Sequence, residues 1–355
     1  MSIQTSTPII DRIHGGNCAE GLIDFSTSIN PFGPPPEAVE AYGSAAARIS
    51  EYPPSYPRAL EERIASWLGI SSDCVLAGNG SIQLLYLLAR RLKLRSPCVV
   101  VPTFSEVTNA LIASDATPKA LHTTSERDFR LTPADIGEAL DSEVDAIFLG
   151  RPNSPTGYLL SFQDTADVVA RCRRHDAWCV IDEAFIEFAD DSRSTVELIG
   201  SSPKLLVLRS LTKIFSIPGL RIGYLIGLPQ TIGRLREVIE PWSVNAVAIR
   251  VASACLEVSR DFIKRTRAMI RSQRGDIERK LDRPSRIQVF PSSANFVMFK
   301  VLAEREAGEF GRHMRSEGIM VRDLKTLPGC GPGYYRVAIR NPDDNARLVK
   351  AVGSF

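Results

Sequence analysis

At 355 residues the chain can bury a sizeable core and hold two domains, and its formal net charge of +2, without a long basic stripe, argues against a nucleic-acid binder. Its seven cysteines are scattered without a C-x-x-C pair, which predicts reduced thiols in a cytosolic protein and neither a disulfide framework nor a zinc site. No apolar run is long enough to cross a bilayer and the first residues lack a secretory signal, so we expect a cytoplasmic protein without a membrane partner.

Residues 1–36 are rich in Gly, Pro, Asn and Ser and cannot form a long helix. This composition predicts an N-terminal arm that lies on another part of the protein. A frayed terminus is the alternative, because chain ends are commonly mobile unless something ties them down. The apolar run Leu22 to Phe25 favours a packed arm.

Residues 37–245 alternate between helix-like and strand-like patterns. The amphipathic stretches are Glu61 to Leu68 and Ile82 to Leu92, and the short apolar runs are Cys98 to Val101, Ala146 to Leu149, Trp178 to Ile181 and Leu205 to Leu208. This alternation predicts a large α/β domain whose mostly parallel sheet is covered by helices on both faces. Ligands bind such sheets at the carboxyl ends of the strands, so the residues that follow each run are the candidates for a site.

Residues 246–355 predict a smaller α+β domain. A helical stretch runs to about Leu281, strands follow near 287–290 and 295–299, a helix lies near 307–317, and a last strand covers 334–339. The chain would therefore consist of an arm, a large domain and a small C-terminal domain.

Lys213 stands in a polar turn directly after the apolar run that ends at Leu208. A partly dry lysine loses its proton readily and becomes an amine nucleophile that forms a Schiff base with an aldehyde cofactor, of which pyridoxal phosphate is the usual one. Ser210 and Arg221 flank it with a hydroxyl and a planar cation that suit a phosphate. Taken alone the pattern is weak, because most Ser-x-x-Lys strings are solvated turns.

Other strand ends supply the groups that pyridoxal chemistry requires. Asp182 follows a buried run and would keep the ring nitrogen protonated, and Asn153 offers an amide to the ring oxygen. Phe104 could stack on the ring, although a core phenylalanine is an almost equal alternative. The loop Gly80-Ser81-Ile82 opens a predicted helix and offers backbone N–H groups to the cofactor phosphate.

With these residues the chain resembles the fold-type I pyridoxal-phosphate enzymes of the aminotransferase superfamily along nearly its whole length. The shared motifs are Asn153-x-Pro155-Thr156-Gly157, Asp182-Glu183-Ala184, Ser210-x-x-Lys213 and Arg221-x-Gly223. Within the superfamily it is most similar to the threonine-phosphate decarboxylases of cobalamin biosynthesis, close relatives of histidinol-phosphate aminotransferases. That similarity includes His14-Gly15-Gly16-Asn17, Tyr334-Tyr335-Arg336, and Phe185 where many relatives carry a tyrosine.

The resemblance implies roles for matching positions. Lys213 would hold the cofactor and reprotonate the substrate carbon, and Arg336 would grip the substrate carboxylate. Tyr52 would reach the cofactor phosphate of a neighbouring subunit, which implies a homodimer with shared sites. His14 and Arg322 are candidates for the substrate phosphate, with a loop histidine and a surface ion pair as the alternatives. The remaining implied contacts are Ala184 with the cofactor, and Asn30 and Asn153 with the substrate.

Two departures from the family pattern fall where the distal end of the substrate should bind. The segment between Asn17 and Asp24 is shorter than in typical decarboxylases, and Asp323 to Leu327 replaces an expected Asn-aromatic element. We therefore expect decarboxylation of an O-phosphorylated amino acid, with L-threonine phosphate as the favoured substrate. Transamination of histidinol phosphate or a related amine is the second hypothesis, and a non-enzymatic regulator built on the same fold is the third.

Overall fold

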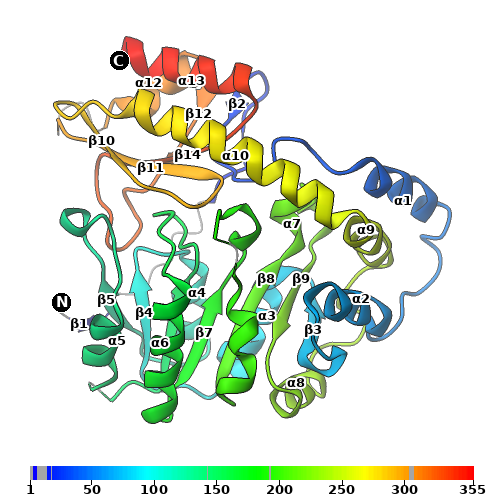
Figure 1. The fold of residues 1–355 in the computed structure, drawn as a ribbon. Helices are drawn as coiled ribbons and strands as arrows, with labels where there is room; N and C mark the ends of the chain where they lie inside the picture. Colours follow the sequence, from blue (N-terminus) through cyan, green and yellow to red (C-terminus); the bar gives the residue numbers. More distant parts are fainter. Residues whose placement is uncertain (1–2, 6–13, 17, 142, 192, 304–307) are drawn as a thin grey trace.

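The chain forms two main sheets in the computed structural model, which describes residues 3–5, 14–16, 18–141, 143–191, 193–303 and 308–355 (Figure 1). In the described residues the larger sheet has the order β1-β5-β4-β6-β7-β8-β9-β3. Its strands are β1 (Ile3–Thr5), β3 (Val75–Gly78), β4 (Pro97–Val101), β5 (Lys119–His122), β6 (Ala146–Gly150), β7 (Trp178–Asp182), β8 (Leu205–Ser210) and β9 (Gly223–Ile226).

The centre of this sheet is parallel. Strands β5, β4, β6, β7 and β8 pair in parallel, whereas β9 runs antiparallel to both of its neighbours and β1 runs antiparallel to β5. The prediction of a mostly parallel sheet is therefore confirmed. Because the parallel strands share one direction, the residues after Val101, Gly150, Asp182 and Ser210 all emerge at the same edge.

Helices cover both faces of the larger sheet. Along β8, Val207 joins one buried cluster and its neighbours Leu206 and Leu208 join another, as the alternation of strand side chains requires. The first cluster includes side chains from α2 (Arg58–Leu68), α5 (Pro133–Leu140), α6 (Phe162–Arg174) and α9 (Ala246–Glu257). The second includes side chains from α3 (Gly80–Arg91), α4 (Glu106–Ile112) and α8 (Pro229–Arg236). The helix α1 (Pro36–Ala46) packs on α9.

The C-terminal part contains an antiparallel sheet in the order β10-β11-β14-β13. Its strands are β10 (Ile287–Phe290), β11 (Phe296–Val301), β13 (Arg322–Asp323) and β14 (Tyr334–Ala338), and its helices are α10 (Ser259–Leu281), α12 (Phe310–Ser316) and α13 (Pro342–Ser354). The expected continuous helix before residue 281 is two helices, because the chain leaves the helical conformation at Val258. Figure 1 shows α10 running from α9 to the C-terminal sheet. The domain limits at residues 36 and 245 remain a prediction.

The described part of the N-terminal arm packs on both halves of the molecule. Its short strand β2 (Ile23–Asp24) pairs in parallel with β12 (Ile319–Met320), and Phe25 is fully buried. Farther along, the side-chain amide of Asn30 donates to the Ile214 carbonyl at 2.8 Å. These contacts fix the arm from His14 onward at the edge where the parallel strands end, while residues 6–13 and Asn17 lie outside the described residues. No described helix combines the length and apolar character needed to span a membrane.

Candidate active site

A cavity of about 720 Å³ lies at the carboxyl ends of the parallel strands, bounded by the arm on one side and by β13 and β14 on another. Twelve of the residues predicted from sequence line it: His14, Gly80, Ser81, Ile82, Phe104, Asp182, Ala184, Ser210, Lys213, Arg221, Arg322 and Arg336. Strand ends, a helix start and the C-terminal sheet thus bring these residues together from positions far apart in the sequence.

Lys213 sits in the one-turn helix α7 (Leu211–Ile214), which begins where β8 ends. The Ser210 hydroxyl caps this turn by accepting from the Thr212 backbone N–H at 3.3 Å, so the lysine is held close to the strand end. Burial, reinforced by the guanidinium groups of Arg336 and Arg221 and opposed by Asp182, lowers the pKa of Lys213 from 10.5 to about 8. Its amine therefore loses a proton far more easily than an exposed lysine does.

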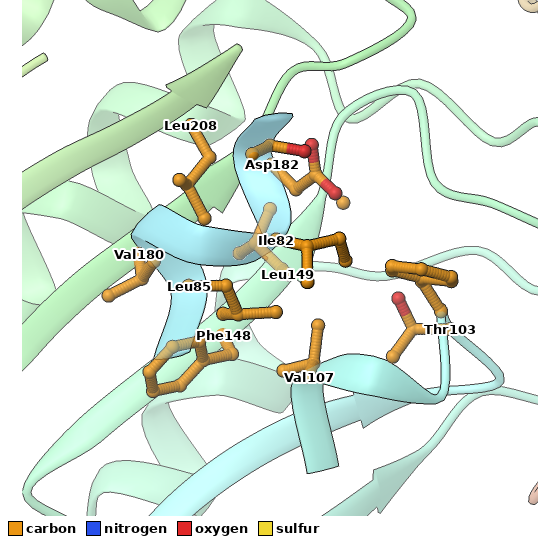
Figure 2. Close-up of a pocket in the computed structure, with 12 residues that line it drawn as sticks. Ile82, Leu85, Thr103, Val107, Phe148, Leu149, Val180, Asp182 and Leu208 are labelled. Carbon is orange, nitrogen blue, oxygen red and sulfur yellow. The ribbon is translucent and has the colours of Figure 1, made fainter. Parts of the chain in front are cut away.

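Asp182 closes β7 above an apolar floor. Figure 2 shows its carboxylate above Ile82 and Leu149, with Leu208 beside it. The same residues line a small cavity of about 20 Å³. Burial raises the pKa of Asp182 to about 6, against the opposing influence of the Ala184 backbone N–H, which donates to Oδ1 at 2.9 Å, and of the Lys213 charge. A carboxylate that is poorly hydrated in this way favours a cationic partner.

The start of α3 lies against Arg221. Gly80 has a positive φ of 74°, and a Cβ at this position would come within 2.7 Å of Arg221 Nη2, so a larger residue would push the guanidinium away. Arg221 itself has a φ of 55°, and its Nη1 donates to the Pro218 carbonyl at 3.0 Å. Backbone N–H groups at a helix start, the Ser210 hydroxyl and this cation together form a site suited to a phosphate.

Arg336 lines the cavity from β14, and two hydrogen bonds hold its guanidinium. Its Nη1 donates to Ser154 Oγ at 2.9 Å and its Nη2 to the Ser26 carbonyl at 3.0 Å. Its buried Nε has no hydrogen-bond partner among the described residues, so one N–H group of the side chain is left to donate to a ligand. Burial and the neighbouring Arg322 charge lower the pKa of Arg336 to about 10, although Asp24 opposes them. The Arg336 guanidinium is therefore held in a fixed orientation and is suited to bind an anion.

His14 reaches the cavity from the arm. Its ring lies 5.5 Å from that of Phe104, and its Nε2 is 3.2 Å from Oε1 of Glu106, a buried residue at the start of α4. Glu106 also lines the cavity and was absent from the sequence prediction. Its position a few residues after the end of β4 was the available signal.

Three predicted site residues are not on the cavity wall. Both N–H groups of the Asn153 amide are taken, by the Pro102 carbonyl at 2.8 Å and Thr156 Oγ1 at 3.0 Å, so neither faces the cavity as a spare donor. Asn30 is buried and ties the arm to Ile214. Tyr52 is 86% exposed and packs only beside Trp242, with ring centroids 5.6 Å apart. A role for Tyr52 within its own subunit finds no support in this position.

Several cavity residues were not predicted as site residues. Besides Glu106, they include Thr103, whose hydroxyl donates to Asn153 Oδ1 at 3.0 Å, and Ser154, which holds Arg336. Leu324 and Leu327, from the segment that departs from the family pattern, add an apolar surface to the wall. Thr103 follows a predicted strand and Ser154 lies within the Asn153 turn motif. The two leucines belong to the 323–327 segment, which was expected near the distal end of the substrate, but neither was predicted as a site residue.

Buried ion pairs support the turns that follow β7 and β8. Arg151 and Glu183 are fully buried and joined at 3.1 Å, and Glu183 also accepts from the Thr195 backbone N–H and hydroxyl, both at 2.7 Å. Arg209, which precedes Ser210, binds the buried Glu187. Arg151, Glu183 and Arg209 lie at or next to strand ends, so the network fixes the backbone that carries Asp182 and Ser210.

Comparison with known proteins identifies the class of this chain. Residues 20–352 match the family described as aminotransferase class I and II, and the chain belongs to that family, whose members depend on pyridoxal phosphate. The fold is fold-type I, as predicted, and the described residues fit the cofactor: a lysine with a lowered pKa, a poorly hydrated carboxylate and a glycine-lined helix start face one cavity.

Particular relatives narrow the comparison. The chain is 32% identical over 355 residues to the threonine-phosphate decarboxylase of Salmonella typhimurium, covering 97% of this chain and 96% of the relative. It is 30% identical over 347 residues to a histidinol-phosphate aminotransferase of Methanopyrus kandleri, covering 93% and 87%. The crystal structure of L-threonine-O-3-phosphate decarboxylase from Porphyromonas gingivalis superimposes with a TM-score of 0.83 at 25% identity, covering 93% and 98%.

Proposed function

We propose that this protein is a pyridoxal-phosphate-dependent carboxy-lyase that converts L-threonine O-3-phosphate to (R)-1-aminopropan-2-yl phosphate and CO2. The observation that carries the proposal is the pair Arg322 and Arg336 on the wall of the cavity that contains Lys213. A substrate with both a carboxylate and a phosphate needs two cationic sites near the amine-reactive group, and this wall offers them. The similarity to threonine-phosphate decarboxylases supports the same assignment.

In this proposal the residues around the strand ends hold the cofactor. Lys213 would carry it, Asp182 would pair with its ring nitrogen, Phe104 and Ala184 would contact its ring, and Gly80, Ser81, Ile82, Ser210 and Arg221 would bind its phosphate. When bound, the cofactor supplies an electron-accepting ring that stabilises the negative charge left on the substrate carbon when a bond to it breaks. Asp182 favours the cationic ring nitrogen because its carboxylate is poorly hydrated.

Arg336 would bind the substrate carboxylate and set its orientation. Its guanidinium is already fixed by Ser154 and the Ser26 carbonyl, so the carboxylate would meet a preorganised fork. After CO2 leaves, Lys213 in its ammonium form would return a proton to the same carbon. Because the pKa of Lys213 is lowered to about 8, its ammonium is a stronger acid than that of an ordinary lysine.

Transamination is the second candidate. The chain is also similar to histidinol-phosphate aminotransferases, and most of the same residues would serve a reaction that begins with loss of the Cα proton. Phe185 lines the cavity with its ring edge-on to Phe296, at 5.0 Å and 85°. It provides no hydroxyl for the ring oxygen, and the resemblance associates phenylalanine at this position with decarboxylases. This favours the lyase.

We further infer that the protein works as a homodimer. Large exposed apolar side chains gather in residues 32–56 and at Trp242: Phe32, Val39, Tyr42, Ile49, Tyr52 and Tyr56 are 39–86% exposed. Trp242 is tied to this segment, because its backbone N–H donates to the Ser55 carbonyl at 2.9 Å. Such a surface suits a second copy of the chain, and Tyr52 would then act in the partner's cavity.

The reaction is tested with purified protein, added pyridoxal phosphate and L-threonine phosphate. We expect stoichiometric release of CO2 and of the aminopropanol phosphate when no 2-oxo acid is present. Lys213→Ala is the control for non-enzymatic release. Consumption of substrate only when 2-oxoglutarate is added, with formation of glutamate and no CO2, would instead establish the aminotransferase.

A further inference from the structure

Glu106 is a buried carboxylate that faces the cavity without being exposed to bulk solvent. Only 7% of its surface is accessible, and it accepts hydrogen bonds from three directions. Oε2 accepts from the Tyr86 hydroxyl at 2.9 Å, while Oε1 accepts from Asn109 Nδ2 at 3.0 Å and lies 3.2 Å from His14 Nε2. Tyr86 lies on α3 and Asn109 on α4, so the carboxylate is held by two helices of the larger domain.

The hydrogen bonds around Glu106 favour its ionised form. Burial opposes its charge, but the hydrogen bonds from Asn109 and Tyr86, followed by the charge and hydrogen bond of His14, lower its pKa below the ordinary 4.5. An ionised carboxylate only accepts hydrogen bonds, so the proton in the contact belongs to Nε2 of His14. Among the described residues Nδ1 has no hydrogen bond, which leaves that ring nitrogen for a ligand.

On the side of the cavity formed by the arm, Asp24 is held by hydrogen-bond donors in the same way as Glu106, unlike the poorly hydrated Asp182 at the end of β7. Asp24 accepts from the Ser26 backbone N–H at 2.7 Å, the Ser26 hydroxyl at 2.6 Å and the Thr27 hydroxyl at 2.8 Å. With Glu106 bound to three donors and Asp24 to these, neither carboxylate needs a ligand as a partner. Arg336 is a buried cation on this wall with a lowered pKa, which an anionic ligand would relieve, and His14 lines the same cavity.

We propose that Glu106 is a positioning residue that holds His14 across the cavity so that its Nδ1 meets the phosphate of a phosphorylated amino-acid substrate. The inference rests on the proposed function, because it assigns His14 to the distal phosphate. Glu106 does not touch the substrate itself. It links the arm to α4, so the phosphate site would exist only when the arm is docked, and its carboxylate would balance the charge of an imidazolium.

The test is a double-mutant cycle with Glu106→Ala, His14→Ala and the double variant, each assayed with L-threonine phosphate. Glu106→Ala should raise KM about 10- to 100-fold, the range of a hydrogen bond to a charged group, and change kcat less than about threefold. In the His14→Ala background, Glu106→Ala should add less than about threefold, because both substitutions remove one unit. Glu106→Gln keeps an acceptor oxygen and should recover part of the affinity.

Two further measurements separate positioning from mere support of the fold. Unphosphorylated L-threonine, measured as a competitive inhibitor, should bind Glu106→Ala as well as it binds the wild type, whereas inorganic phosphate should bind the variant more weakly. Glu126→Ala removes an exposed carboxylate outside the cavity and should behave as wild type. Retained cofactor absorbance in every variant shows that the protein has folded.

Three results would overturn the inference: equal loss of affinity for L-threonine and L-threonine phosphate, additive effects of the two substitutions, or unchanged phosphate binding in Glu106→Ala. The proposed function fails in a different way, namely if the wild type releases no CO2. In that case calorimetry with inorganic phosphate on the wild type, Glu106→Ala and His14→Ala still decides whether Glu106 acts through His14.

Discussion

Arg322 and Arg336 are Cα partners across the antiparallel pair β13 and β14, and both line the cavity that contains Lys213. Burial lowers the pKa of Arg336, and the Arg322 charge lowers it further, because directly opposite residues of like charge repel each other across a strand pair. An anionic ligand bound between them would reduce this repulsion. Two neighbouring cations on this wall therefore suit the anionic substrate that we propose.

Replacement of Arg336 tests the carboxylate site. Arg336→Lys keeps the charge but loses the planar fork held by Ser154 and the Ser26 carbonyl. We expect kcat/KM for L-threonine phosphate to fall about 10- to 100-fold, as for the loss of a charged hydrogen bond. Steady-state assays check this, with Lys325→Arg, an exposed position outside the cavity, as the reverse control. A variant as active as wild type would show that Arg336 does not bind the substrate carboxylate.

Asp182→Asn tests the partner of the ring nitrogen. The amide keeps the shape of the carboxylate but cannot stabilise a cation, so turnover should fall by about 100-fold or more, the effect typical of removing one preorganised electrostatic partner. Measurement of kcat at saturating cofactor isolates this effect from cofactor binding. Near-normal kcat in the variant would show that Asp182 has no such role.

The pH dependence of cofactor capture follows from Lys213. Its pKa of about 8 leaves roughly a tenth of the amine neutral at pH 7, compared with about one part in 3,000 for a lysine of pKa 10.5. Capture of pyridoxal phosphate by cofactor-free protein should therefore accelerate as pH rises and level off above about 8. Stopped-flow absorbance measures the rate, and a profile still rising steeply at pH 10 would mean that the lysine is not perturbed.

The lowered pKa of Lys213 also makes the stability of the cofactor-free protein depend on pH. Between about pH 8 and 10.5 the folded cofactor-free protein binds fewer protons at Lys213 than the unfolded chain does. The contribution of this residue to the free energy of unfolding should therefore rise with pH across that window. Denaturant unfolding of the cofactor-free wild type and Lys213→Met at pH 7.5 and 10 checks the sign. A gap between the two proteins that does not change with pH would contradict it.

The buried pair Arg151 and Glu183 should matter for stability more than for chemistry. Glu183→Ala leaves a buried guanidinium without its partner and removes the acceptor for the Thr195 backbone N–H and hydroxyl. We expect the free energy of unfolding to drop by about 3–5 kcal/mol. Urea unfolding measures the loss, and Glu197→Ala, which breaks an exposed ion pair with Arg193, should cost less than about 1 kcal/mol.

The residues at the strand ends could be predicted because parallel strands all end at the same edge of the sheet. The apolar runs at 98–101, 146–149, 178–181 and 205–208 all became strands of the larger sheet, and the residues after them reached the cavity. Strand β3 (Val75–Gly78) was missed, although its run is as long as those that were predicted. It lies at the edge of the sheet, outside the parallel strands, and pairs antiparallel with β9.

The hydrogen-bond partners of the side chains inside the site could not be predicted from the sequence. Asn153 and Asn30 have the chemistry of ligand-binding amides, but their hydrogen bonds are taken by local backbone and hydroxyl groups. Tyr52 is a surface residue of the single chain, and the role that we propose for it requires a second copy. Conversely, three donors from different segments converge on Glu106, and its position shortly after the end of β4 indicated a place near the site but not these contacts.

The central claim is that Lys213 carries pyridoxal phosphate, and borohydride trapping tests it most directly. Reduction of the purified holoprotein, digestion and mass spectrometry should find the reduced cofactor on the peptide that contains Lys213, and nowhere in Lys213→Ala. Lys204, a half-buried lysine at the other end of β8 that is paired with Asp176, provides an internal control for non-specific labelling. Recovery of the cofactor on another lysine, or an unlabelled Lys213 peptide from active protein, would contradict the account.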